Sequence, residues 1–206
     1  VVASRGLGDV YKRQPKGIVI TLPDAAALGK SVKAAIAAGI PVISMNSGSD
    51  DYASLGISAH VGQTEFEAGV GGGQKMKAAG GKKALCVNHE VGNVALDRRC
   101  AGFKKGFGGS VDILGTSNDP TEIQKAVAAK LGGGYDTILT LGAGLSGEAA
   151  LKALEAAGKV GDVRLGTFDM SPNMLKAAAA GKVEFLIDQQ QYLQAVSYTH
   201  LTLPTT

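Results

Sequence analysis

The sequence lacks any long apolar run and any strong excess of one sign of charge. No stretch of 18 or more apolar residues occurs, so no segment has the length of a membrane-spanning helix. The formal net charge is +3, but residues 1–14 hold three of the 21 basic side chains and one of the 18 acidic ones, so the remaining chain is nearly neutral. Nucleic-acid binding normally requires a concentrated basic face, and we therefore expect no nucleic acid as a partner.

Patterns of catalytic and metal-binding residues are also missing. The sequence has no Ser–His–acid spacing, no nucleophile elbow and no cluster of metal ligands. We therefore expect a protein that is not an enzyme and that uses no cofactor and no metal. Cysteine is limited to Cys86, on a predicted strand, and Cys100, on the helix that follows. A disulfide and a pair of buried free thiols are both compatible with this placement.

The two ends of the chain do not join the pattern of the rest. Residues 1–14 and 197–206 show no helical or strand period that continues into their neighbours, and both resemble translated adapter sequence. We interpret them as non-native tails around a truncated fragment that runs from about Pro15 to Val196.

What is present is an alternation of short apolar runs with helical patterns. The apolar runs are GIVIT (17–21), VISM (42–45), ISAHV (57–61), ALCV (84–87), VDIL (111–114), TILTL (137–141), VRLGTF (163–168) and VEFLID (183–188). Continuous apolar strands joined by helices are typical of parallel sheets that are covered on both faces. The predicted fold class is therefore α/β, with doubly wound parallel sheets.

Capping residues mark several helix starts. Asp119-Pro120 and Ser171-Pro172 each combine a good N-cap with proline at the first helical position. Residues 64–67 have the spacing of a capping box, which predicts a helix from there to about Ala79. The segment GVGGG (69–73) lies inside this helix, and we interpret it as a place where a neighbouring element approaches closely.

Polar side chains follow the ends of the predicted strands. Ligands of open parallel sheets bind beyond the carboxyl ends of the strands, so these positions define a candidate site. They are Asn46, Gln63, Asn88, His89, Glu90, Thr116, Gly142, Ala143, Asp169 and Gln189, with Arg99 on the helix after His89. Carboxylate, amide and guanidinium groups suit a polyhydroxylated ligand. Any single member could also be polar only because strand ends are exposed, and His89 could equally be an ordinary loop residue.

A competing signal is the segment Gly142 to Gly147. It is a complete G-x-G-x-x-G after a predicted strand, with Asp169 further along the chain, and formally fits a dinucleotide-binding fingerprint. An NAD-dependent enzyme that uses this turn is therefore one alternative. The other interpretation is a close-packed strand–helix turn whose backbone amides face a ligand.

From Gly17 to Gln194 the chain resembles the sugar-binding proteins of ABC importers, the ribose-binding-protein-like type I periplasmic binding proteins. The blocks that carry the resemblance are GIVITLPD, AAIAAGIPVISMN, ALDRRCAGFKKGF, ALKALEAAG, LGTFDMSPNMLKAAAAGKVEF and IDQQ, in this order. The resemblance implies a two-lobed fold with an incomplete N-terminal lobe. The implied organisation is a partial N-terminal lobe at 15–82, a C-terminal lobe at 83–190 and the start of a return crossover at 191–196.

The resemblance also places four residues where the family binds sugar hydroxyls, namely Asn46, Arg99, Asp169 and Gln189. Two departures leave the particular sugar open. Asn46-Ser47 stands where many relatives have Asp-Arg, and Ala143-Gly144 stands where the family often has Asn-Asp. The implied ligand is a monosaccharide or a similar polyhydroxylated small molecule.

The mechanism implied by the resemblance is closure of two lobes about a hinge. A ligand that touches both lobes binds the closed state more tightly, and a membrane permease of the importer then recognises that state. The protein would be a monomer in the periplasm, or a cell-surface lipoprotein in a Gram-positive cell. The effector domain of a lac-repressor-type regulator shares this fold and is the other alternative, which an upstream DNA-binding module would distinguish.

Overall fold

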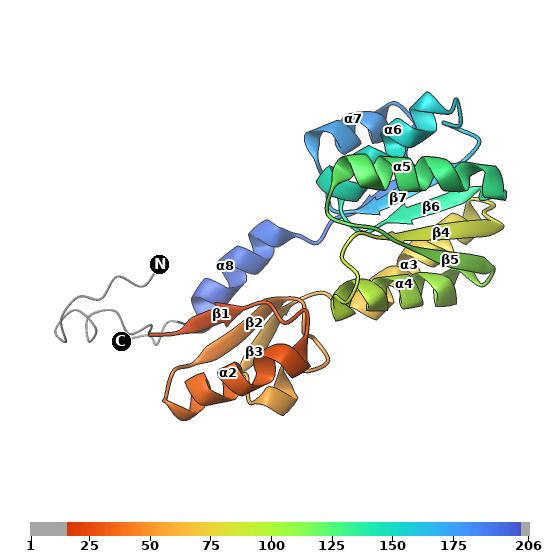
Figure 1. The fold of residues 1–206 in the computed structure, drawn as a ribbon. Helices are drawn as coiled ribbons and strands as arrows, with labels where there is room; N and C mark the ends of the chain where they lie inside the picture. Colours follow the sequence, from red (N-terminus) through yellow and green to blue (C-terminus); the bar gives the residue numbers. More distant parts are fainter. Residues whose placement is uncertain (1–15, 203–206) are drawn as a thin grey trace. The chain divides into compact units, whose positions relative to one another are not determined.

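The computed structural model describes residues 16–202, which form two compact units (Figure 1). The chain leaves the first unit after Gly62, forms the second unit from Gln63 to Gln190, and returns to the first unit at Gln191. The tail expected at 1–14 lies outside the described residues, as does 203–206. Within the described part of the chain, no helix combines the length and the apolar character needed to cross a membrane.

The first unit contains a small parallel sheet. Its elements are β1 (Ile18–Ile20), α2 (Ala25–Ala37), β2 (Val42–Asn46), a 3-10 turn (Ala53–Leu55), β3 (Ala59–Gly62) and α8 (Gln191–Thr202). The strands lie side by side in the order β1-β2-β3. Asp24 begins α2 by accepting hydrogen bonds from the backbone amides of Ala26 and Ala27, and Val32 of this helix is buried with Val42 of the sheet.

The second unit contains a five-stranded sheet in which every pairing is parallel. The strands are β4 (Lys83–Asn88), β5 (Ser110–Gly115), β6 (Thr137–Thr140), β7 (Arg164–Phe168) and β8 (Phe185–Ile187). The helices are α3 (Glu65–Ala78), α4 (Val94–Phe107), α5 (Pro120–Lys130), α6 (Glu148–Ala156) and α7 (Pro172–Ala179). The strand order is β5-β4-β6-β7-β8, so the predicted doubly wound α/β class is confirmed.

Helices cover both faces of this sheet (Figure 1). On one face, α5, α6 and α7 bury side chains such as Ile123, Leu154 and Met174 against the strands. On the other face, α3 and α4 bury Met76 and Phe103. These apolar layers on each side explain why the central strands read as continuous apolar runs.

Helices α3 and α4 contact each other through glycine. A Cβ atom added at Gly69 would lie 2.2 Å from the carbonyl oxygen of Arg99, and one added at Gly102 would lie 2.0 Å from that of Phe66. Gly73 is similarly close to the backbone of α4. The two backbones therefore pack with no room for a methyl group, which confirms the interpretation of the glycine-rich segment as a close contact.

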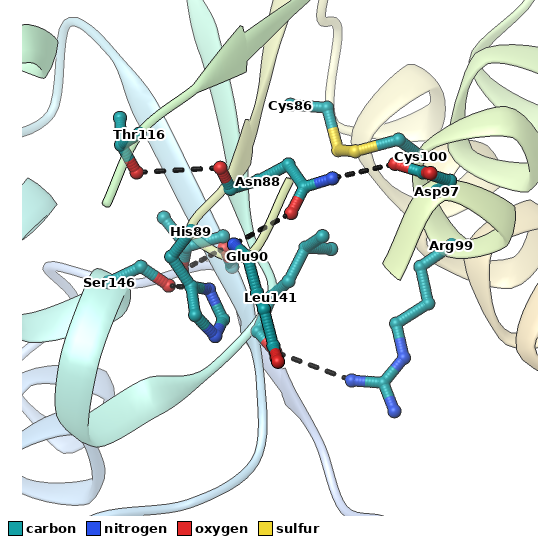
Figure 2. The surroundings of a disulfide bond; sticks show 12 residues. Cys86, Asn88, His89, Glu90, Asp97, Arg99, Cys100, Thr116, Leu141 and Ser146 are labelled. Atoms are coloured by element: carbon teal, nitrogen blue, oxygen red, sulfur yellow. Dashed lines mark hydrogen bonds between the residues drawn. A yellow bond between two sulfur atoms is a disulfide. The ribbon is translucent and has the colours of Figure 1, made fainter. Parts of the chain in front are cut away.

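The two cysteines form a disulfide that joins β4 to α4 (Figure 2). Both residues are fully buried. The structure thus selects the disulfide from the two possibilities that the sequence left open, and it fixes the helix that carries Arg99 to the strand that leads to His89.

Two of the three predicted helix starts have the expected hydrogen bonds. Asp119 accepts from the amides of Thr121 and Glu122, and Ser171 accepts from the amide of Met174. The capping box predicted at 64–67 is wrong, because Thr64 makes no side-chain hydrogen bond at the start of α3.

The division between the units differs from the expected one. The structure places it between Gly62 and Gln63 rather than after residue 82, because α3 packs along α4 and so belongs to the second unit. The return at Gln191 falls where the return crossover was expected. Helix α8 continues to Thr202, so residues 197–202 are helical although their sequence predicted no helical period.

Candidate functional site

The carboxyl ends of β4 and β6 define a switch point in the second sheet. The two strands are neighbours, but the connections that follow them lead to opposite sides, since β5 lies beyond β4 and β7 lies beyond β6. Such a point leaves a crevice at the sheet edge where ligands of open α/β sheets bind. Most of the predicted site residues lie at this edge.

Arg99 of α4 is the centre of a buried polar network, with 4% of its surface exposed. Its Nε donates to Oε2 of Glu65 in a buried ion pair, and its Nη2 donates to Oε1 of the same carboxylate at 3.1 Å. Nη1 donates to the carbonyl oxygen of Leu141 at 3.3 Å (Figure 2). The guanidinium carbon lies 4.5 Å from the centre of the Phe168 ring, in a cation–π contact.

The network extends from Arg99 to the ends of β7 and β8. Nη2 of Arg99 donates to Oε1 of Gln189 at 2.7 Å, and Nε2 of Gln189 donates to Oδ1 of Asp169. Nε2 of Gln63 donates to Oε1 of Gln189 and to Oε2 of Glu65, each at 3.0 Å. The structure thus brings together four predicted residues, Gln63, Arg99, Asp169 and Gln189.

Most donors of Arg99 are used inside this network. A guanidinium has five N–H groups. In the described part of the chain, Glu65 accepts two of them, while Gln189 and Leu141 accept one each. These contacts leave one N–H on Nη1 that none of these three residues accepts. Arg99 therefore serves mainly to hold the amide of Gln189 in place.

Asp169 has a left-handed backbone conformation, with φ of 66°. Aspartate tolerates this region better than most residues do, but it is still uncommon outside glycine. The conformation comes directly after the last residue of β7, and the amide of Asp169 still donates to the carbonyl of Ile187 at 2.9 Å. Backbone strain of this kind is concentrated at functional sites, where it orients a side chain.

His89 lies between the ends of β4 and β6. Its Nδ1 is 3.3 Å from Oγ of Ser146 (Figure 2). Burial lowers the pKa of His89 below its usual value. The negative charges of Glu90 and Asp169 raise this pKa, whereas the positive charge of Arg99 lowers it further. The imidazole is therefore neutral near pH 7.

Two predicted residues lie outside the network. Glu90 is exposed, and its carboxylate accepts from the amide of Asn93 at the start of α4. Ala143 is 1% exposed and its methyl group belongs to the apolar core under α5, α6 and α7. Only the backbone of Ala143 can take part in a site at this edge.

Asn46 belongs to the first unit, where it ends β2. It has a left-handed backbone with φ of 60°, as Asp169 has in the second unit. The next residue, Ser47, is buried and its hydroxyl is 2.6 Å from that of Thr21. Both units therefore present a polar residue in a strained conformation directly at or after the end of a strand.

The glycine-rich segment after β6 forms a π-helical turn over Ala143–Gly147. The amides of Ser146 and Gly147 donate to the carbonyl of Gly142, and the hydroxyl of Ser146 contacts the same oxygen. A Cβ at Gly147 would lie 3.1 Å from the hydroxyl of Thr167. The close-packed interpretation of this segment fits these contacts, and two of its amides are used within the turn.

Glu65 is the member of the polar network that the sequence did not predict. It is 3% exposed and supplies the carboxylate that neutralises Arg99. An acidic residue in the first turn of a helix is ordinarily explained by the helix dipole. The sequence therefore gives no reason to expect that Glu65 pairs with Arg99. Its position two residues after Gln63, which follows a predicted strand, is the one available signal.

A doubly wound sheet with a buried polar set at its carboxyl edge has the features of a small-molecule binding protein. The sequence matches the periplasmic binding protein domain family over residues 7–202, and the chain belongs to this family. No curated protein matches the sequence.

Solved structures agree with this assignment. A carbohydrate transporter protein of Acidothermus cellulolyticus 11B, in complex with myo-inositol, is 33% identical, with a TM-score of 0.83 over 91% of this chain and 65% of that one. A periplasmic sugar binding protein of Legionella pneumophila is 25% identical, with a TM-score of 0.80 over 95% of this chain and 76% of that one. A periplasmic solute binding protein of Actinobacillus succinogenes 130z with bound D-allose is 20% identical and shares the fold, with a TM-score of 0.77 over 95% of this chain and 72% of that one.

The chain spans 65% of the length of the Acidothermus protein. The family and these structures are substrate-binding proteins. They lend no support to the NAD-dependent enzyme considered above.

Proposed function

We propose that this chain is the solute-binding component of an ABC-type sugar importer and binds a monosaccharide or a similar polyol. The observation that carries the proposal is the hydrogen-bonded series Arg99–Gln189–Asp169 at the carboxyl edge of the second sheet. Arg99 and Gln189 are 90 residues apart in the sequence, and Asp169 and Gln189 are 20 apart, yet one network holds all three groups at the same edge. The ligands named for similar proteins, myo-inositol and D-allose, are both polyhydroxylated.

The chemistry of the edge suits hydroxyl groups. Asp169 supplies a carboxylate acceptor, Gln189 supplies an amide, and Arg99 retains one N–H donor. A hydrogen bond to a neutral partner contributes about 0.5–1.5 kcal/mol and one to a charged partner about 1.5–3 kcal/mol. Five to seven such bonds give an affinity in the micromolar range, about −8 kcal/mol.

The same proposal implies a partner protein and a cellular location. A permease of the importer would accept the ligand from it, and the protein would act in the periplasm or on the outer surface of a Gram-positive cell. We propose no catalytic step, since substrate binding accounts for the polar groups at the sheet edge.

Calorimetric titration of the 206-residue chain tests the proposal. The probes are myo-inositol, D-allose, D-ribose and NAD. We expect at least one of the polyols to bind and NAD not to bind. Binding of NAD without any response to the polyols would overturn the proposal and favour the nucleotide-binding alternative.

Asp169→Ala locates the ligand. We expect it to weaken binding by about 2 kcal/mol, roughly thirtyfold, because a charge-assisted hydrogen bond is lost and its partners are left unsatisfied. Asp162→Ala is the matched control, since Asp162 is an exposed aspartate of the same unit that only pairs with Lys159 at the surface. Equal affinities of the two variants would remove Asp169 from the site.

A further inference from the structure

The ends of β4 and β6 carry a second polar contact, separate from the Arg99 network. Ser146 is fully buried in the turn after β6. Its Oγ lies 3.0 Å from the carbonyl oxygen of Gly142 and 3.3 Å from Nδ1 of His89. Figure 2 shows the imidazole with Nδ1 directed toward this hydroxyl.

Only one arrangement of protons makes both contacts attractive. A serine hydroxyl has a single proton, and a carbonyl oxygen can only accept. If Ser146 donated to His89, its oxygen would face the oxygen of Gly142 at 3.0 Å with no proton between them. The hydroxyl therefore donates to Gly142, and Nδ1 of His89 carries a proton that it donates to Ser146. In this tautomer Nε2 has a lone pair and acts as an acceptor.

The acceptor edge of His89 lies beside Gly142 and Asp169. A Cβ atom placed on Gly142 would be 3.2 Å from Cε1 and 3.6 Å from Nε2 of His89, and 3.8 Å from Oδ2 of Asp169. The absence of a side chain at Gly142 thus lets the imidazole and the carboxylate approach the same spot. The contact that His89 makes with Ser146 uses Nδ1, on the other side of the ring from Nε2.

We propose that His89 is a specificity-determining residue that accepts a hydrogen bond from a ligand hydroxyl through Nε2, and that Ser146 fixes the tautomer required for this. The inference rests on the proposed function and names a contact within it. Because His89 and Asp169 are both acceptors, the ligand must present two donors there, such as adjacent hydroxyl groups. A ligand with a methyl ether at one of these positions is rejected.

The contact makes binding depend on pH. The charged groups that face His89 are Glu90 on its own loop, Arg99 on α4 and Asp169 after β7. Burial keeps the pKa of His89 low, so Nε2 is an acceptor near neutral pH. Protonation removes the lone pair of Nε2, so the ligand hydroxyl can no longer donate its hydrogen bond to His89. Affinity is therefore constant above the pKa of His89 and falls below it, by up to about tenfold per pH unit.

Two measurements on the 206-residue chain test the inference. The first is nitrogen NMR of ¹⁵N-histidine-labelled protein near pH 7.5, which distinguishes the two neutral tautomers. We expect His89 to carry its proton on Nδ1, and Ser146→Ala to produce a mixture of tautomers. A proton on Nε2 in the unmodified protein would overturn the inference, whatever ligand binds.

The second measurement is titration with myo-inositol, D-allose and D-ribose between about pH 8 and pH 5. We expect affinity to fall as the pH is lowered. His89→Gln places an amide oxygen near the position of Nε2 and cannot titrate, so the affinity of this variant should not fall as the pH is lowered. His60→Gln is the control, because His60 contacts Ser44 and Tyr52 in the first unit, and it should retain the fall.

The outcomes separate this inference from the proposed function. Polyol binding whose pH dependence is the same in the parent and in His89→Gln overturns the role of His89 and leaves the proposed function standing. Failure of every polyol to bind at pH 8 overturns the proposed function and, with it, the ligand contact of His89.

Discussion

The two faces of the second sheet are held in different ways. Under α5, α6 and α7, apolar side chains such as Ile123 and Leu154 fill the space between helix and strand. Under α3 and α4, the backbones meet at glycine, a disulfide joins β4 to α4, and a buried ion pair joins Glu65 to Arg99. The first face depends on side-chain volume, whereas the second depends on a few specific contacts, among them the ion pair at the centre of the buried polar network.

The largest expected effect comes from removing one partner of the buried ion pair. Glu65→Ala leaves the charge of Arg99 buried without its carboxylate, which should lower the free energy of unfolding by about 3–5 kcal/mol. Urea unfolding measures this. Glu67→Ala is the control, because Glu67 lies in the same first turn of α3 but is exposed, and it should change stability by no more than about 0.5 kcal/mol. Similar values for the two variants would mean that the ion pair does not hold this face together.

The disulfide should have the next largest effect. Cys86 and Cys100 are 14 residues apart, and closing a loop of that length stabilises a protein by about 3 kcal/mol. Replacing both with alanine should lower the free energy of unfolding by this order, measured by the same unfolding experiment. Conversely, a double variant with unchanged stability would show that packing alone fixes α4 to β4.

The smallest expected effect distinguishes glycines within the contact of α3 and α4. Gly102→Ala should lower the free energy of unfolding by about 1–3 kcal/mol, because the new methyl group would meet the carbonyl of Phe66. Gly71→Ala, at a position of α3 with no atom within 4 Å of the added carbon, should raise stability by about 0.5–1 kcal/mol. Thermal melts of both variants would show opposite shifts, and shifts of the same sign would contradict the close contact.

The order of strands and helices could be predicted from the sequence because each element carries its own pattern. Apolar runs identified the strands, and Asp119 and Ser171 identified two helix starts through local hydrogen bonds. The division between the units could not be predicted in the same way. The loop between α3 and β4 has the composition of any helix–strand connection, and only the packing of α3 on α4 places the division before Gln63.

The members of the polar network were easier to predict than their partners. The positions after strand ends included Gln63, Asp169 and Gln189, which the structure joins in one network, but they also included Ala143, whose methyl group is in the core. Glu65 was missed because its partner Arg99 is 34 residues away, and such pairing has no local signal. The tautomer of His89 likewise depends on Ser146, which no sequence pattern connects to it.

The hydrogen bond between Gln63 and Gln189 joins the first residue of the second unit to its last but one. The segments by which the chain enters and leaves this unit are therefore linked directly to each other, so the unit is a sequence insertion whose two ends are held together. The amide that links them is the one that Arg99 and Asp169 hold. A displacement of Gln189 would therefore reach both segments that connect the two units.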